Sequence, residues 1–290
     1  MKKFLIFCLA AGCQLLLQGQ SPKENKQLLI RLDDLGFSHA ANTGAEKIFR
    51  AGFPVSVSVM APGPWFEEAV KIIKKYPQVS VGVHLTLNAE WENYKWGPVS
   101  GPSAVPSLVD SNGYFPWKVT WFYKDIMKIE EMEKELTAQI EKVVRSGLKI
   151  DYIDGHMGAC GMTPEQKDLM KKLAARYHVF ISGDEGEHHT KGVEAFYNRP
   201  GDFLNTLDSL TAGITLMVNH PGDDTPEMQA LMVQTDKPDP SQAGMVAKQR
   251  AAVAAVLSSE EFKKKIEKNN ITLINYRMLK TQKQMREKTK

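Results

Sequence analysis

The sequence predicts an α/β fold, namely a deformed (β/α) barrel of about seven mostly parallel strands, in a single domain with an aromatic-rich insert. Short apolar runs rich in β-branched residues alternate with helix-like segments, an order that indicates parallel strands with right-handed crossovers. The number of runs suggests a barrel, which can be incomplete. The 290 residues, 42% apolar and 24% charged, suffice for one large core.

Seven segments carry the strand signal of apolar, β-branched residues between turn-forming ones. They are residues 28–32, 55–60, 79–87, 149–153, 179–182, 215–218 and 271–276. Within residues 79–87, small and polar side chains alternate with valine and leucine, which places His84 on the small, polar face. That face has room for a ligand, although a histidine satisfied within the core is the alternative.

Helix signals fill the gaps between these runs. Thr163 with Gln166 forms a capping box that has proline at the first helical position. Ser258 with Glu261 is predicted to form a second box. The longest helix is expected over residues 129–146, where the apolar residues follow one stripe.

Residues 1–20 are predicted to be a secretory signal peptide. A short positive region precedes an apolar run through residue 17, which is too short for a resident transmembrane helix. The residues around Cys13 loosely resemble a lipoprotein cleavage box, so lipidation at Cys13 is the alternative to simple cleavage. Either route exports the protein to a periplasm or cell surface, and only lipidation makes the membrane a partner. Cleavage leaves Cys160 alone, without an intramolecular disulfide.

The α/β domain is expected to span residues 21–279, followed by a basic, solvated and partly frayed tail at 280–290. The 37 basic and 34 acidic residues give a net charge of +3. This balance argues against a nucleic-acid partner.

The insert comprises residues 90–121, which show neither a helical nor a strand period. Four of the five tryptophans lie in it, among prolines and glycines. A loop of this length is usually functional or disordered, and the tryptophans argue against disorder. The rings can stack on sugars or pack the insert onto the barrel, and the sequence leaves both interpretations open.

Residues able to bind a metal or move protons lie at or near the ends of four of the strand-like runs. They are Asp33 and Asp34, His84, Asp154 with His156, and His220. Strand ends of an α/β protein lie on one face, so these side chains can meet there. One aspartate and two histidines from three strands suit catalytic zinc, and also non-haem iron. Such a metal activates water and polarises a carbonyl, so a metal-dependent hydrolase is the leading hypothesis.

The two adjacent acids need a special backbone, because neighbouring strand residues point to opposite faces. Gly36 lets the chain bend so that both carboxylates face one site, one on the metal and one as general base. The alternative is that Asp33 or Asp34 caps the helix near Ser38.

Each remaining candidate residue has a functional or a purely structural interpretation. Asp154 is expected to fix the tautomer of His156. His220 is expected to act as a general acid, and the alternative is that it merely caps the end of its strand. Cys160 is interpreted as a buried bystander. The pair His188-His189 is interpreted as surface residues.

The order and spacing of four motifs resemble one known family. They are Asp33-Asp34-Leu35-Gly36-Phe37-Ser38, Val81-Gly82-Val83-His84-Leu85-Thr86-Leu87, Asp154-Gly155-His156 and His220-Pro221-Gly222. The chain resembles the YdjC-like family of carbohydrate deacetylases and, more distantly, polysaccharide deacetylases. The likeness runs from about residue 28 to about residue 273.

The resemblance implies a deformed α/β barrel that removes an acetyl group from an N-acetylated sugar. It implies Asp34, His84 and His156 as the ligands of a divalent metal ion, zinc or magnesium. Asp33 would then be the general base, and His220 would protonate the leaving amine. The implied partners are an N-acetylated carbohydrate and a second copy of the chain in a homodimer.

Two positions depart from the family pattern. Gly158 stands where the family usually has a second histidine, and Val253 stands where an acid often follows Arg250. The substrate range is therefore open. Two other functions remain, a different metal-dependent hydrolase or oxygenase on the same ligands and a non-catalytic, surface glycan-binding protein.

Overall fold

The computed structural model describes residues 25–120, 127–237 and 239–288. The predicted signal peptide at residues 1–20 lies outside the described residues, as does Trp121 of the insert. No helix in these three ranges combines the length and the apolar character needed to cross a membrane.

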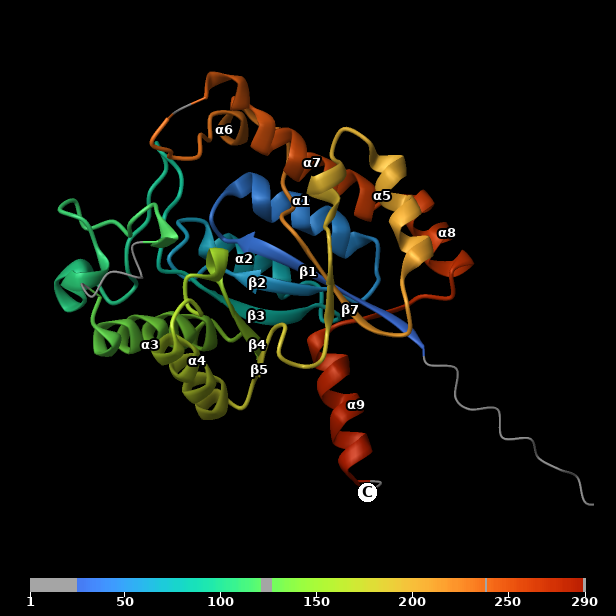
Figure 1. Cartoon of the computed structure of the whole chain (residues 1–290), viewed down its shortest axis with the longest axis horizontal. Coiled ribbons are helices and arrows are strands. Elements are labelled where there is room, and N and C mark those ends of the chain that lie inside the picture. The colour runs from blue at the N-terminus through green and yellow to red at the C-terminus, as the bar shows by residue number, and fades with distance from the viewer. Residues whose placement is uncertain (1–24, 121–126, 238, 289–290) are drawn as a thin grey trace, which may run out of the picture.

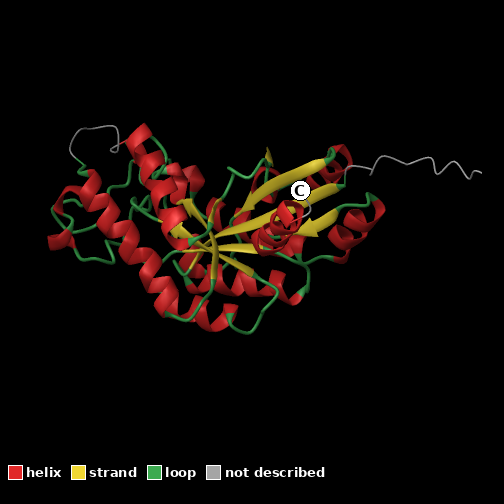
Figure 2. Cartoon of the chain, turned by 90° about the horizontal axis from the view of Figure 1, so that it is seen from below, coloured by secondary structure: helices red, strands yellow, loops and turns green. Residues whose placement is uncertain are grey.

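One curved sheet of eight strands, all paired in parallel, forms the centre of the molecule (Figures 1 and 2). The strands are β1 (Lys26–Leu35), β2 (Ser56–Val59), β3 (Ser80–Leu85), β4 (Ile150–Gly155), β5 (Phe180–Ile181), β6 (His188–Thr190), β7 (Gly213–Asn219) and β8 (Thr272–Ile274). Seven follow the order β5-β4-β3-β2-β1-β7-β6, and β8 pairs with β1. Within the described residues no pairing joins β5 to β6, so the predicted deformed barrel is confirmed as an open half-barrel.

The α-helices lie around this sheet. They are α1 (His39–Arg50), α2 (Phe66–Ile73), α3 (Ile129–Arg145), α4 (Pro164–Tyr177), α5 (Pro200–Thr206), α6 (Pro226–Gln229), α7 (Met245–Leu257), α8 (Glu260–Lys268) and α9 (Tyr276–Lys288). Short 3₁₀ helices lie at Pro102–Ala104, Pro106–Leu108, His156–Gly158, Val193–Phe196, Leu207–Ser209 and Pro240–Gln242. The large apolar core lies between the sheet and the helices.

The inner face of the half-barrel carries different side chains from the outer face. Successive residues of β1 alternate, so Leu29 faces inward, whereas Leu28 and Ile30 belong to the outer core. Tyr152 and Tyr276 fill the interior with ring centroids 4.3 Å apart. Gly82 makes room for them, because a Cβ atom there would lie 2.4 Å from the Tyr152 ring.

Helix α9 closes the amino end of the half-barrel. The backbone N–H groups of Tyr276 and Arg277 donate to the hydroxyls of Ser56 and Ser80, at the starts of β2 and β3. The expected strand at 271–276 therefore ends at Ile274. Residues 280–288, expected as a frayed tail, are helical, because buried Leu279 and these hydrogen bonds anchor the start of α9.

Two further local features of the structure differ from what the sequence led us to expect. Strand β6 was not predicted, because its residues His188–Thr190 are polar and lack an apolar alternation. Ser259 rather than Ser258 caps α8, with its hydroxyl accepting from the Phe262 N–H at 3.1 Å. The capping box of Thr163 with Gln166 at the start of α4 is confirmed.

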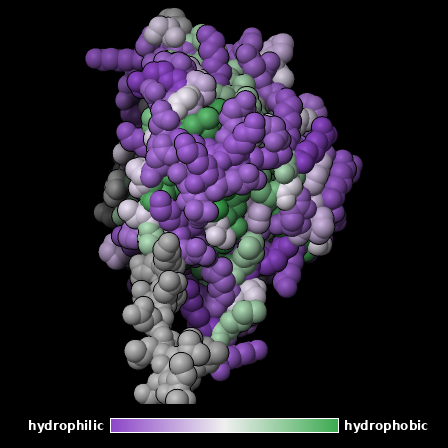
Figure 3. All heavy atoms as spheres, turned by 90° about the vertical axis from the view of Figure 1, so that its right-hand side faces the viewer, coloured by the Kyte–Doolittle hydropathy of each residue, from purple (hydrophilic) through white to green (hydrophobic). Residues whose placement is uncertain are grey.

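The side of the molecule near the amino ends of the strands presents mostly hydrophilic side chains, with hydrophobic ones in small areas between them (Figure 3). The homodimer expected from the resemblance stays a prediction.

We expect Ser259→Ala to lower the free energy of unfolding by about 1 kcal/mol, because the first turn of α8 loses its side-chain acceptor. The matched control is Ser258→Ala, whose hydroxyl donates to the Ala254 carbonyl at 2.7 Å and the Ala255 carbonyl at 3.4 Å but accepts from no N–H group of α8. Urea unfolding of both variants measures the difference. A larger loss for Ser258→Ala would contradict this assignment of the cap.

Candidate metal centre

All five predicted site residues lie at the carboxyl ends of strands, on the side where the insert also lies (Figure 1). The two adjacent acids face the same site because Asp34 has a φ of 68°, and the register between β1 and β2 shifts between Leu32 and Leu35. Aspartate is among the few non-glycine residues that tolerate this left-handed conformation. The predicted bend therefore occurs, but at Asp34 as well as at Gly36, whose φ is 96°.

Three side chains converge on one point. Asp34 Oδ1 lies 3.3 Å from both His84 Nε2 and His156 Nδ1, and the two nitrogens are 3.1 Å apart. Donor atoms of one tetrahedral zinc ion, each 2.0–2.1 Å from it, are separated by about 3.3 Å. All three residues are buried, and Asp34 Oδ1 has no hydrogen-bond partner. The residues therefore fit a metal ion.

Carboxylates behind the two histidines fix the ring orientations. Asp154 Oδ2 lies 2.7 Å from His84 Nδ1, and Glu90 Oε2 lies 2.9 Å from His156 Nε2. Such partners fix the tautomer of a metal-binding imidazole. The prediction that Asp154 fixes the tautomer of His156 was wrong, because the parallel pairing of β3 with β4 places His84 opposite Asp154.

Glu90 was missed by the sequence reasoning because no motif surrounds it. Its signal is the alternation that begins in β3, since Ser80, Gly82, His84 and Thr86 occupy every second position and the series continues to Glu90.

Arg31 binds Asp33, the first of the two adjacent acids. Its Nε donates to Asp33 Oδ1 at 2.7 Å and its Nη2 to Asp33 Oδ2 at 2.6 Å. The same Nη2 lies 3.3 Å from Asp154 Oδ2, and Nη1 donates to Ser182 Oγ at 2.7 Å. Burial raises the pKa of Asp33, but the charges of Arg31 and His84 outweigh it and lower the pKa to about 2. The signal for Arg31 is a lone cation two residues before Asp33 in an apolar strand.

Arg250 binds Asp34, the second of the two adjacent acids. Its Nη2 donates to Asp34 Oδ2 at 2.5 Å, so that Oδ1 alone is left toward the histidines. Burial raises the pKa of Asp34, yet Arg250 and the two histidines lower it well below the usual range. The guanidinium lies 4.9 Å from the centre of the Phe37 ring, which supports it from one side.

The charge balance of this cluster favours a divalent cation. Four buried carboxylates, those of Asp33, Asp34, Asp154 and Glu90, face two guanidinium groups, which leaves two negative charges. The same excess acts on the imidazoles. Burial lowers the pKa of each, but the carboxylates raise it, well above its usual value for His84 and to about 9 for His156.

His220, at the end of β7, is the most accessible of the five, with a side chain that is 38% exposed. Its Nδ1 lies 3.0 Å from Glu194 Oε1, which also accepts the His220 backbone N–H. Partial burial lowers the pKa of His220, but Glu194 and Asp34 raise it. Glu194 lies in the 3₁₀ helix Val193–Phe196 and was not predicted, since no sequence pattern relates it to His220.

The aromatic residues of the insert fall into a buried group and a more accessible group. Trp91 and Trp96 are buried against Phe37, and Trp96 Nε1 donates to the Asn88 carbonyl at 2.8 Å. These two rings pack the insert onto the barrel. Tyr114 and Trp117 are more accessible and line a cavity of about 340 Å³, so the sugar-stacking interpretation stays open for them.

The remaining candidates lie away from the ligand atoms. Cys160 is buried with its Sγ 3.4 Å from the Leu85 carbonyl, and burial raises the pKa of its thiol. His188 and His189 are exposed on β6, as surface residues. Gly158 ends the 3₁₀ helix that begins with His156.

Comparisons with known proteins agree on one family. The family model described as "YdjC-like protein" matches residues 27–268. A carbohydrate deacetylase of Enterococcus faecalis is 27% identical and covers 88% of this chain and 98% of its own length. A carbohydrate deacetylase of Brevibacillus brevis is 29% identical, with coverages of 86% and 98%.

Solved structures share the fold. A protein from Enterococcus faecalis, described as a candidate cellobiose-phosphate cleavage protein, superposes with a TM-score of 0.71 at 26% identity and covers 88% of this chain and 99% of its own. The peptidoglycan deacetylase PdaC of Bacillus subtilis superposes with a TM-score of 0.51 at 11% identity, covering 92% and 96%. The second likeness concerns the fold alone.

We expect Glu90→Gln to weaken binding of a divalent metal by about tenfold or more, because His156 loses the charge that orients its ring. Calorimetric titration of the metal-free protein with zinc measures the affinity. Glu92→Gln, two residues along the chain and exposed, is the matched control. Equal affinities of both variants would refute the role assigned to Glu90.

Proposed function

Because the chain belongs to the YdjC-like protein family, we propose that it is a metal-dependent carbohydrate deacetylase that hydrolyses the acetamide of N-acetylated sugars or oligosaccharides. The observation that carries the proposal is the convergence of Asp34, His84 and His156, with Asp34 Oδ1 left unpartnered. The names of the relatives from Enterococcus faecalis and Brevibacillus brevis support the reaction class.

Asp34, His84 and His156 would hold the metal ion. Two imidazole nitrogens and one carboxylate oxygen favour zinc over magnesium, which prefers oxygen ligands. When bound, such an ion supplies an activated water and polarises the acetamide carbonyl.

Asp33 acts as the general base in this proposal. The bidentate contact with Arg31 keeps its carboxylate ionised across the working pH range and fixes its direction. It therefore stands ready to accept a proton from the attacking water. Arg31 also contacts Asp154, so one guanidinium group positions both the proposed base Asp33 and the carboxylate that orients His84.

His220 acts as the general acid. Glu194 fixes the ring through Nδ1, which leaves Nε2 as the atom that donates a proton to the leaving amine. Glu194 and Asp34 raise the pKa of His220, which favours the protonated ring that a general acid needs. Base and acid thus come from β1 and β7, which are neighbours in the sheet.

Three further properties form part of the proposal. The first 20 residues direct export to a periplasm or cell surface, and an anchor at Cys13 is the lipidated alternative. Residues 21–279 act as one catalytic unit. The protein works on its carbohydrate as a homodimer.

The proposal predicts acetate release from oligomers of N-acetylglucosamine, abolished by a chelator and restored by zinc. Asp33→Asn should lower kcat by about 10²–10⁴-fold with bound metal unchanged, because the proton acceptor is lost while the three proposed metal-binding side chains are kept. Asp202→Asn, on exposed α5, is the control. Metal-loaded protein that binds these oligomers but releases no acetate would point to the glycan-binding alternative.

Replacing Glu194 should move the pH dependence. Glu194 raises the pKa of His220, so Glu194→Gln lowers that pKa, and the ring loses its proton at a lower pH. The alkaline limb of the kcat/KM profile then shifts toward lower pH, while the acidic limb stays in place. Glu260→Gln, on the surface of α8, should leave the profile unchanged. An alkaline limb that does not move would exclude His220 as the acid.

A further inference from the structure

Arg31, which binds Asp33 through Nε and Nη2, has a third hydrogen bond that leads away from the metal centre. Its Nη1 donates to Ser182 Oγ at 2.7 Å. Ser182 Oγ lies 2.5 Å from Tyr276 Oη, which in turn lies 2.7 Å from Glu187 Oε1. A chain of two hydroxyl groups therefore joins the guanidinium group on β1 to a carboxyl group in the turn between β5 and β6.

The direction of the hydrogen bonds in this hydroxyl chain is fixed at both ends. The guanidinium group of Arg31 can only donate, so Ser182 Oγ accepts from it. Both oxygens of Glu187 accept backbone N–H groups of its own turn, at 3.2 and 2.7 Å. Tyr276 therefore donates to Glu187, and Ser182 donates its single hydrogen to Tyr276. Each hydroxyl group thus accepts one hydrogen bond and donates one, which makes the chain complete.

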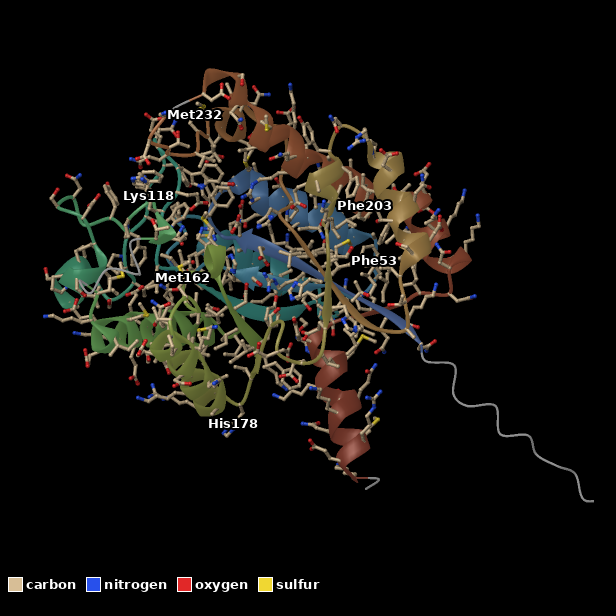
Figure 4. All side chains as sticks on the ribbon, in the orientation of Figure 1. Phe53, Lys118, Met162, His178, Phe203 and Met232 are labelled. Atoms are coloured by element: carbon tan, nitrogen blue, oxygen red, sulfur yellow. The ribbon has the colours of Figure 1, made fainter. Side chains whose placement is uncertain are left out.

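Other contacts fix the backbone on which the two hydroxyl groups lie. Tyr276 is fully buried, and its backbone N–H donates to Ser56 Oγ at 3.2 Å. One turn further along α9, Lys280 Nζ donates to the His178 carbonyl at 2.6 Å, and Figure 4 labels His178 at the end of α4, just before β5. The Ser182 backbone N–H bonds to a carbonyl of β4 at 3.0 Å. The hydroxyl chain therefore has a fixed place between α9 and the end of β5.

This fixed place decides which edge of the guanidinium group faces Asp33. The group is planar, so binding of Nη1 by Ser182 leaves Nε and Nη2 as the edge that contacts the carboxylate. Without the bond to Ser182, the group is free to turn toward Asp154, whose Oδ2 already lies 3.3 Å from Nη2. The direction of the Asp33 carboxylate therefore depends on the hydroxyl group of Ser182.

We propose that Ser182 and Tyr276 are positioning residues, which hold Arg31, and through it the carboxylate of Asp33, in one direction. The inference rests on the proposed function, in which Asp33 is the general base. It gives helix α9 a part in the reaction besides closing the amino end of the half-barrel. In this role neither residue touches the substrate, and both act through the guanidinium group.

The interior of the half-barrel contains a matched pair of control residues. Tyr152 Oη and Ser58 Oγ lie 2.9 Å apart, and both residues are fully buried. The Tyr152 ring packs against that of Tyr276, but no hydrogen bond among the described residues links either control hydroxyl to Arg31. Tyr152→Phe and Ser58→Ala therefore remove the same atoms from the same interior without breaking the hydroxyl chain.

The first test is independent of turnover and follows the Arg31 Nε–H group by NMR, with Arg31→Lys to assign its resonance. Hydrogen exchange of this group with solvent requires that it leave Asp33. Ser182→Ala should speed the exchange by about tenfold or more, the equivalent of one lost hydrogen bond to a charged group. Tyr276→Phe should speed it by a smaller factor, since the Ser182 hydroxyl remains, and both control variants should leave the rate unchanged.

The second test measures whether the effect reaches the reaction. At saturating zinc, Ser182→Ala should lower kcat by about tenfold or more with KM unchanged, because a displaced base affects only the chemical step. In an Asp33→Asn background the same substitution should lower kcat no further, since the group that the hydroxyl chain positions is gone. A purely structural role would give the same loss in both backgrounds.

Unchanged exchange in Ser182→Ala would overturn the proposal, as would equal effects of Tyr276→Phe and Tyr152→Phe on the exchange rate. A loss of kcat that is repeated in full in the Asp33→Asn background would overturn it as well. If the native protein releases no acetate, the proposed function fails, and the exchange rates alone decide whether the hydroxyl chain holds Arg31 on Asp33.

Discussion

The constraint on which the rest of the site depends is the burial of four carboxylates at the carboxyl ends of the strands. Burying a charge is costly unless it is paired and hydrogen-bonded. Arg31 engages Asp33 and Asp154, and Arg250 engages Asp34, but two guanidinium groups do not balance four acids. The remaining charge would favour a divalent cation at this cluster, and the carboxylates also raise the pKa of the imidazoles.

The half-barrel holds this cluster in register. Parallel pairing of β3 with β4 places His84 opposite Asp154, and pairing of β1 with β7 brings Asn219, the neighbour of His220, opposite Leu32. Below the cluster, Tyr152 and Tyr276 fill the interior, and α9 closes the amino end. The candidate metal ligands therefore lie on strands, or directly after one, with packed neighbours, which is the arrangement that keeps a site within its productive geometry.

The sequence was informative where a residue's own neighbours decide its structure. Apolar runs predicted seven of the strands, and the motifs at their ends identified the five residues that the structure brings to one side. Partners supplied by the fold were not predictable. Glu194 lies in a segment without a period, and Glu90 is marked only by an alternation that continues past the end of β3. Asp154 could be assigned to the right histidine only once the strand register was known. The polar strand β6 and the amphipathic start of α9 owe their structure to tertiary contacts, which no local pattern records.

The central claim is that Asp34, His84 and His156 form one metal site with Asp33 and Asp154 outside it. X-ray absorption spectroscopy of the protein loaded with one equivalent of zinc tests this most directly, because it counts imidazole ligands and detects sulfur. The account predicts two imidazoles with oxygen donors, and a shell that loses no imidazole in Asp33→Asn. A shell with one imidazole, or with the sulfur of Cys160, would contradict it.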